Sequence, residues 1–132
     1  MENVVAIIDD EEDILTIYQV MLGTTATKLG IRIETFLSAK EFINYLSSNY
    51  DKFVTLIILS DINMPEMDGF SLLQYMNENY PQFKIIMQSA YTDESYISKA
   101  LEKGASDYLT KPIDFNALKV RLEEEFRHEN HS

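Results

Sequence analysis

Five short apolar or β-branched runs alternate along the chain with segments of helical periodicity, and this alternation restricts the fold more than any other feature. Three of the runs are apolar at nearly every position, which is typical of parallel strands with helices on both faces. The second run alternates between apolar and polar residues, so we expect it near a sheet edge. We predict an α/β fold with a doubly wound five-stranded parallel sheet and five helices. The predicted strands are Val4–Ile8, Ile31–Phe36, Val54–Leu59, Lys84–Gln88 and Ser106–Thr110.

Local signals indicate where the helices begin and end. Ser38 and Glu41 form a capping-box pattern ahead of an apolar helical face. Asp68 is a cap candidate, Gly69 is a residue free to adopt unusual dihedral angles, and Pro81 must end the helix that follows. The remaining signals are Thr92 or Asp93 as a cap, Gly104 as a stop and Asp114 as a last cap.

The chain has 132 residues and a formal net charge of −11. This length fits one domain, which we predict over residues 1–127, followed by a frayed tail at 128–132 that contains His128 and His131. The acidic balance argues against direct binding to nucleic acid or to an anionic membrane. Without cysteine there is no disulfide and no thiolate metal site. We expect a soluble, cytoplasmic protein.

Polar side chains follow four of the predicted strands: Asp9 and Asp10, Asp61, Ser89, and Lys111. The carboxyl ends of parallel strands share one sheet edge, where ligands bind. Two carboxylates ~5 Å apart repel by about 3 kcal/mol at an effective dielectric constant near 20, so such a cluster persists only if one carboxyl stays protonated, a cation lies between the groups, or function requires the strain. Oxygen ligands without histidine or cysteine favour Mg²⁺. Mg²⁺ beside a lysine indicates phosphoryl chemistry, in which an aspartate can be the nucleophile.

Four stretches together resemble the receiver domain of two-component response regulators, in its chemotaxis-regulator-like single-domain type. The resemblance extends from Val4 to about Phe126, and implies a flavodoxin-like three-layer sandwich with strand order 2-1-3-4-5. The matching stretches are Ile7–Glu11, Ser60–Gly69, Gln88–Tyr91 and Gly104–Pro112.

The resemblance implies that Asp61 accepts a phosphoryl group from the phosphohistidine of a sensor histidine kinase or a histidine phosphotransfer protein. Asp10 and Asp61 would bind Mg²⁺ directly, together with the backbone carbonyl of Asn63, and Asp9 would act through a metal-bound water. Mn²⁺ is an expected substitute. Beyond its own phosphorylation and dephosphorylation, we expect no enzymatic activity.

The resemblance also implies a switch. Lys111 would contact a phosphoryl oxygen, and its bond to Pro112 is expected to be cis. The Ser89 hydroxyl would move to the phosphoryl group, and Tyr108 would turn inward, although Tyr108 could equally be a core residue. The change would alter a partner surface on the fourth helix, fifth strand and fifth helix, toward a downstream protein or an output domain.

Residues on the fourth and fifth helices suggest a homodimer or output face, although amphipathic packing explains most of them. Asp107 and Arg121 could pair between subunits. The other candidates are Tyr96, Ile97, Ala100, Leu101 and Lys119.

Three alternatives rank below the receiver reading. A Mg²⁺-dependent phosphohydrolase with an aspartate nucleophile would need a second aspartate where Asn63 stands. A flavin or nucleotide binder would need a glycine-rich loop after the first strand, where acids stand instead. A receiver-like interaction module without phosphorylation would not require the complete set of site residues.

Overall fold

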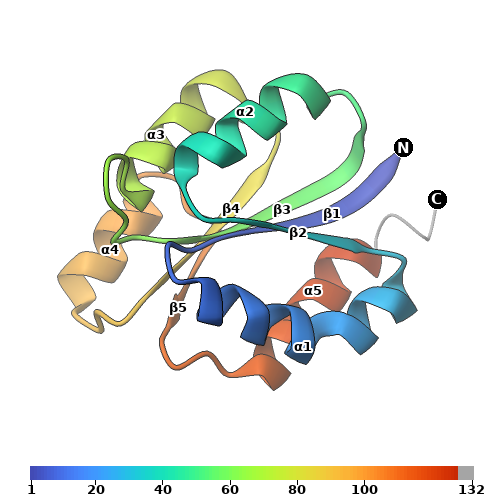
Figure 1. The fold of residues 1–132 in the computed structure, drawn as a ribbon. Helices are drawn as coiled ribbons and strands as arrows, with labels where there is room; N and C mark the ends of the chain where they lie inside the picture. The colour runs from blue at the N-terminus through green and yellow to red at the C-terminus, as the bar shows by residue number, and fades with distance from the viewer. Residues whose placement is uncertain (128–132) are drawn as a thin grey trace.

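A computed structural model describes residues 1–127 and confirms the alternation of five strands and five helices (Figure 1). The sheet is parallel throughout, in the order β2-β1-β3-β4-β5 that the resemblance implied. The predicted tail with its two histidines lies outside the described residues. Within residues 1–127, no helix is long and apolar enough to cross a bilayer. The elements are β1 Glu2–Ile8, α1 Glu12–Leu29, β2 Arg32–Phe36, α2 Ala39–Asn49, β3 Phe53–Asp61, α3 Gly69–Asn79, β4 Lys84–Ser89, α4 Glu94–Glu102, β5 Asp107–Thr110 and α5 Phe115–Arg127.

The sheet separates two hydrophobic cores. Helices α2, α3 and α4 cover one face, and α1 and α5 cover the other (Figure 1). Successive residues of a strand point to opposite faces, so Ile58 joins the first core and Leu59 the second. Burial on both faces explains why the central strands are almost continuously apolar. The alternating strand β2 lies at an edge, as predicted.

The third strand is longer than the sequence indicated. Ser60 and Asp61 belong to β3, where they lie opposite Met87 and Gln88 of β4. Their polar side chains suggested a loop, but strand pairing is made by backbone groups. The aspartate at the carboxyl edge is therefore held by the sheet itself.

The predicted helix caps are mostly confirmed. The Ser38 hydroxyl accepts a hydrogen bond from the Glu41 N–H at 3.1 Å. The Glu41 carboxylate accepts from the Leu37 N–H, one residue earlier than in the usual capping box. Asp93 occupies the cap position of α4, but its side chain accepts no cap hydrogen bond. Asp68 caps α3 through the Ser71 N–H, and Asp114 accepts from the Ala117 N–H.

The prediction for Gly69 is wrong in its reason. Among the described glycines only Gly30 and Gly104 have positive φ, and Gly69 is the first residue of α3. A Cβ at Gly69 would lie 2.5 Å from the backbone carbonyl oxygen of Asp61 and 2.8 Å from Cα of Ile62. Glycine is required because the start of α3 packs directly against the end of β3.

Candidate functional site

Three carboxylates gather at the carboxyl edge of the sheet. Oxygens of Asp9, Asp10 and Asp61 all lie within 4.8 Å of one another. The register explains this, since Ile8 of β1 lies opposite Ser60 of β3 and the next residue of each strand is an aspartate. Asp9 is fully buried and Asp61 is 8% exposed, whereas Asp10 faces solvent. The structure therefore confirms that the three predicted carboxylates lie close together.

Lys111 brings a positive charge into this cluster. Its Nζ lies 2.9 Å from Oδ2 of Asp9 and 3.4 Å from Oδ2 of Asp61. Burial raises the pKa of Asp61 above its ordinary value, the charge of Lys111 opposes that rise, and the charge of Asp9 adds to it. Burial would lower the pKa of Lys111, but its hydrogen bond to Asp9 and the charge of Asp61 raise it overall. The Lys111–Pro112 bond is cis, as expected.

Ser89 and Tyr108 both hydrogen-bond to the backbone of Tyr91. Ser89 is fully buried at the end of β4, and its hydroxyl accepts a hydrogen bond from the Tyr91 N–H at 3.1 Å. The Tyr108 hydroxyl donates to the Tyr91 carbonyl at 2.8 Å. The Tyr108 ring packs against the core under α2, α3 and α4. The predicted switch aromatic is therefore half-buried against this core, with its hydroxyl bonded to the loop that follows Ser89.

The loop after Asp61 carries Asn63, the remaining predicted site residue. Asn63 is exposed, two residues beyond the strand end. Glu66 in the same loop has a φ of 69°, an uncommon value for a residue other than glycine. The tight turn returns the chain so that the Gly69 N–H donates to the Ile62 carbonyl at 2.8 Å. The loop and α3 are thus anchored directly beside Asp61.

Two buried polar residues next to the site were not predicted from the sequence. Gln88 lies opposite Asp61 in the sheet register and is fully buried, and neither its amide oxygen nor its nitrogen has a hydrogen-bond partner within the described residues. The Tyr18 hydroxyl of α1 is also buried without a partner there. Burial raises the pKa of Tyr18, and the charges of Asp9 and Asp61 add to the rise. The signal for Gln88 was an amide within an otherwise apolar run.

The Asp107–Arg121 pair forms within the chain. Nη1 of Arg121 lies 3.2 Å from Oδ2 of Asp107, so the two side chains considered for pairing between subunits already contact each other. On α4, Ala100 is fully buried and belongs to the core, whereas Leu101 is 47% exposed. Packing accounts for Ala100, and Leu101 stays available on the surface.

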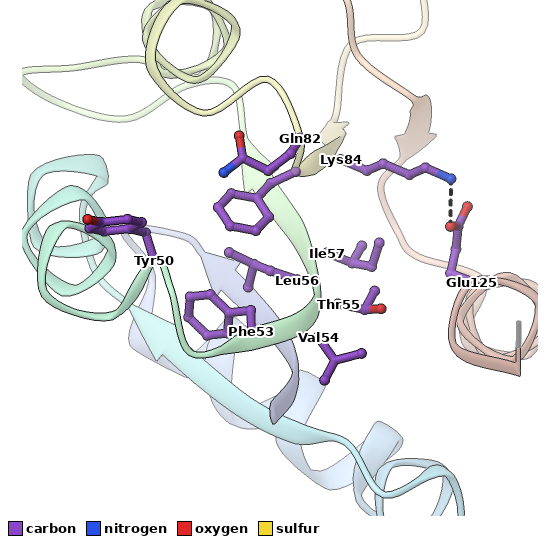
Figure 2. Close-up of a pocket in the computed structure, with 10 residues that line it drawn as sticks. Tyr50, Phe53, Val54, Thr55, Leu56, Ile57, Gln82, Lys84 and Glu125 are labelled. Carbon is purple, nitrogen blue, oxygen red and sulfur yellow. Dashed lines mark hydrogen bonds and ion pairs between the residues drawn. The ribbon is translucent and has the colours of Figure 1, made fainter. Parts of the chain in front are cut away.

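Two pockets of about 400 Å³ each, formed by residues 1–127, are lined by none of the three acids. One, of about 400 Å³, opens at the amino ends of β3 and β4, at the opposite end of the strands from the acids (Figure 2). Phe53 and Leu56 lie on one side of it, and the Lys84–Glu125 ion pair, at 2.9 Å, lies on the other (Figure 2). A second pocket, of about 410 Å³, is largely apolar and lies between α1 and the Lys111–Pro112 bond. The acidic edge remains the candidate site because the charged groups converge there.

Comparison with known proteins gives one family. The model of the response regulator receiver domain matches residues 5–123. The chain is 32% identical over 122 residues to the DNA-binding transcriptional regulator NtrC of Proteus hauseri. This match covers 92% of this chain and 24% of that protein. It is 34% identical over 112 residues to the two-component response regulator ARR10 of Arabidopsis thaliana, covering 85% of this chain and 19% of that protein. The chain thus spans about a quarter or less of these curated relatives.

Solved structures agree with the fold. The signal receiver domain of an HD domain-containing protein from Pseudomonas fluorescens Pf-5 has a TM-score of 0.82 and 26% identity, and the match covers 100% of both chains. The BeF3-activated receiver domain of DrrB has a TM-score of 0.78 and 25% identity, covering 96% of this chain and 99% of that chain. The similarity therefore covers nearly all of the chain, from sheet to helices.

Proposed function

Because this chain belongs to the family of response regulator receiver domains of two-component systems, we propose that it is a phosphorylation switch whose acceptor is Asp61. The observation that carries the proposal is a single contact set. Asp61 lies at the end of a central strand within 3.4 Å of the Lys111 ammonium, and its carboxylate clusters with those of Asp9 and Asp10. Burial keeps the reacting carboxylate out of bulk water.

The transfer is a displacement at phosphorus. A carboxylate oxygen of Asp61 attacks the phosphorus of a partner's phosphohistidine, the new P–O bond forms as the P–N bond breaks, and the imidazole leaves with the electron pair. Asp61 then carries an acyl phosphate. Lys111 is placed to neutralise charge on the phosphoryl oxygens, because its ammonium lies 3.4 Å from Oδ2 of Asp61.

The donor set fits Mg²⁺, with Mn²⁺ as a substitute. Asp10, Asp61 and the backbone carbonyl of Asn63 would hold the ion directly, and Asp9 through a water. These are hard oxygen donors, and the three carboxylates lie close enough to share one cation. The ion would supply positive charge to the phosphoryl oxygens when bound. Exposed Asp10 leaves the cluster open to solvent on one side.

The response to phosphorylation would pass through Ser89 and Tyr108. A phosphoryl group adds about −1.5 to −2 charge and new acceptor oxygens, and the Ser89 hydroxyl can donate a hydrogen bond to one of these oxygens. The Tyr108 hydroxyl donates to the Tyr91 carbonyl in the loop after Ser89, so a change in this loop would move Tyr108 and alter the surface formed by α4, β5 and α5. That surface would act on a downstream protein, an output domain or a second copy.

The setting of the switch follows from the same proposal. We expect the receiver domain to occupy residues 1–127 and to work in the cytoplasm. A sensor histidine kinase or a histidine phosphotransfer protein would be the donor. A phosphohydrolase acting on external substrates is disfavoured because Asn63 has no proton to serve as acid or base.

The test is phosphoryl uptake from acetyl phosphate in the presence of Mg²⁺, followed by intact mass. The wild-type protein should gain one phosphoryl group, and D61N should gain none. D51N, a change at an exposed turn just before the first residue of β3, should behave as wild type. Uptake that persists in D61N, or multiple-turnover hydrolysis of phosphoesters, would contradict the assignment.

A further inference from the structure

The loop between β4 and α4 is joined to two helices by a run of aromatic contacts. The ring centroids of Tyr91 and Tyr96 lie 4.7 Å apart, with an angle of 42° between the planes. Tyr96 of α4 meets Phe70 of α3 edge to face at 5.3 Å. The Lys99 ammonium lies 4.5 Å from the centre of the Phe70 ring. These contacts connect the loop to α4, and α4 to α3.

Tyr91 also carries both switch contacts on its backbone. Its N–H donates to the hydroxyl of Ser89, and its carbonyl accepts from the hydroxyl of Tyr108. Its side chain is 47% exposed and contacts the ring of Tyr96. One residue therefore meets the site through its peptide groups and α4 through its ring.

We propose that Tyr91 is a positioning residue of the switch, whose ring contact with Tyr96 holds its backbone N–H in reach of Ser89 and its carbonyl in reach of Tyr108. The inference rests on the proposed function of those two residues. The orientation of the Tyr108 side chain and the position of α4 are then coupled through this aromatic pair, whether or not Asp61 carries a phosphoryl group.

The physical basis is the cost of ordering a short loop. Residues 90–93 belong to no helix or strand, and fixing such backbone opposes its conformational entropy. An aromatic pair in contact supplies a favourable interaction that is lost when the loop moves. A ligand that prefers the ordered loop binds more weakly when that state is less populated. Removing the ring of Tyr96 should therefore weaken a phosphoryl analogue without touching the acids.

The experiment titrates the full chain with beryllium fluoride in saturating Mg²⁺, observed through backbone amide NMR shifts. Y96A should need about three- to tenfold more beryllium fluoride for half-saturation, the range expected for one aromatic pair. Y96F keeps the ring and should restore wild-type binding. Y50A removes a half-exposed ring at the other end of the sheet and should leave binding unchanged.

A second arm separates coupling from a structural effect. In a Y108F background the hydroxyl that bonds the Tyr91 carbonyl is gone and only the contact with Ser89 remains, so adding Y96A should raise half-saturation by a smaller factor than in the wild-type background. Equal binding by Y96A and wild type, or the same loss in the Y108F background, would overturn the positioning role. A wild-type protein that binds no beryllium fluoride would instead contradict the proposed function.

Discussion

Asp61 is a carboxylate in an unfavourable place. It is nearly buried, and two other carboxylates share its pocket. Among residues 1–127, Lys111 is the cation in ion-pair contact with it, and that ammonium is closer to Asp9. Removal from water raises the pKa of Asp61, so the folded protein holds its charge at a cost. The residue proposed to react is therefore also one that weakens the fold.

This cost predicts a pH-dependent effect of D61N in the absence of divalent ions. The folded-state pKa is raised, so the wild type loses stability as pH rises through that pKa, and the neutral amide does not. D61N should be more stable than wild type at pH 7, on the order of 1 kcal/mol, and the gain should fade near pH 3.5, below the ordinary carboxyl pKa.

Urea unfolding at the two pH values measures the difference. D51N, at an exposed turn, should stay within about 0.5 kcal/mol of wild type at both. A D61N variant less stable than wild type at pH 7 would show that the contact with Lys111 outweighs desolvation.

Gly69 is the second residue whose change should have a large effect. An added methyl would meet the Asp61 carbonyl and the methyl of Met87, each at 2.5 Å, so α3 or β3 must shift. We expect G69A to lose about 1–3 kcal/mol of unfolding free energy and to slow phosphoryl uptake at Asp61.

The control is G23A in α1, where a Cβ would meet nothing within 4 Å. That change should stabilise the helix by about 0.5–1 kcal/mol. If G69A proves as harmless as G23A, the close packing of α3 on β3 is not required.

Helix α2 depends on a cap that can be tested by itself. The Ser38 hydroxyl satisfies the Glu41 N–H at the start of the helix. S38A should cost about 1 kcal/mol in urea unfolding and leave phosphoryl uptake unchanged, because α2 contributes none of the site residues. S47A removes a hydroxyl that only donates to a carbonyl within the same helix, and should cost less. Equal losses in the two variants would contradict the cap.

Periodicity predicted each helix and strand, but polarity misplaced some of their ends. Ser60 and Asp61 are polar and still belong to β3, because register with Met87 and Gln88 depends on backbone groups that side-chain type does not report. At α4, Asp93 has the right residue type and position, but its side chain is not turned to the helix end. Rotamer choice at such a cap depends on surrounding contacts.

The candidate site was predictable to the extent that topology fixes it. The alternation of strands and helices was enough to expect the acids at one sheet edge, and the strand order implied by the family resemblance placed β1 beside β3, which brings Asp9 beside Asp61. The aromatic contacts of Tyr91 were not predictable, because they join a loop, α4 and α3 through side-chain directions. Gln88 and Tyr18 were missed for the same reason, since their burial beneath the site follows from packing of the two layers.

The clustering of acids predicts that Mg²⁺ stabilises the whole molecule. A ligand that binds only the folded state adds about 1.4 kcal/mol at ten times its dissociation constant, and here it also relieves repulsion. The melting temperature should rise in millimolar Mg²⁺, and D10N should lose most of that rise. D51N, outside the cluster, should keep it. An unchanged wild-type melting temperature would contradict the metal assignment.

Gln88 shows where this protein could be made sturdier. Within residues 1–127 neither amide atom of this fully buried side chain has a hydrogen-bond partner, which costs about 1–3 kcal/mol for each atom, and a leucine of similar size would remove that cost. An engineer who wanted a heat-resistant scaffold would begin there, directly beside Asp61. Natural proteins keep such destabilising groups mainly where function requires them. The chain therefore gives up stability at the sheet edge that carries the proposed site. Replacing this amide and measuring phosphoryl uptake would show directly what the site needs from it.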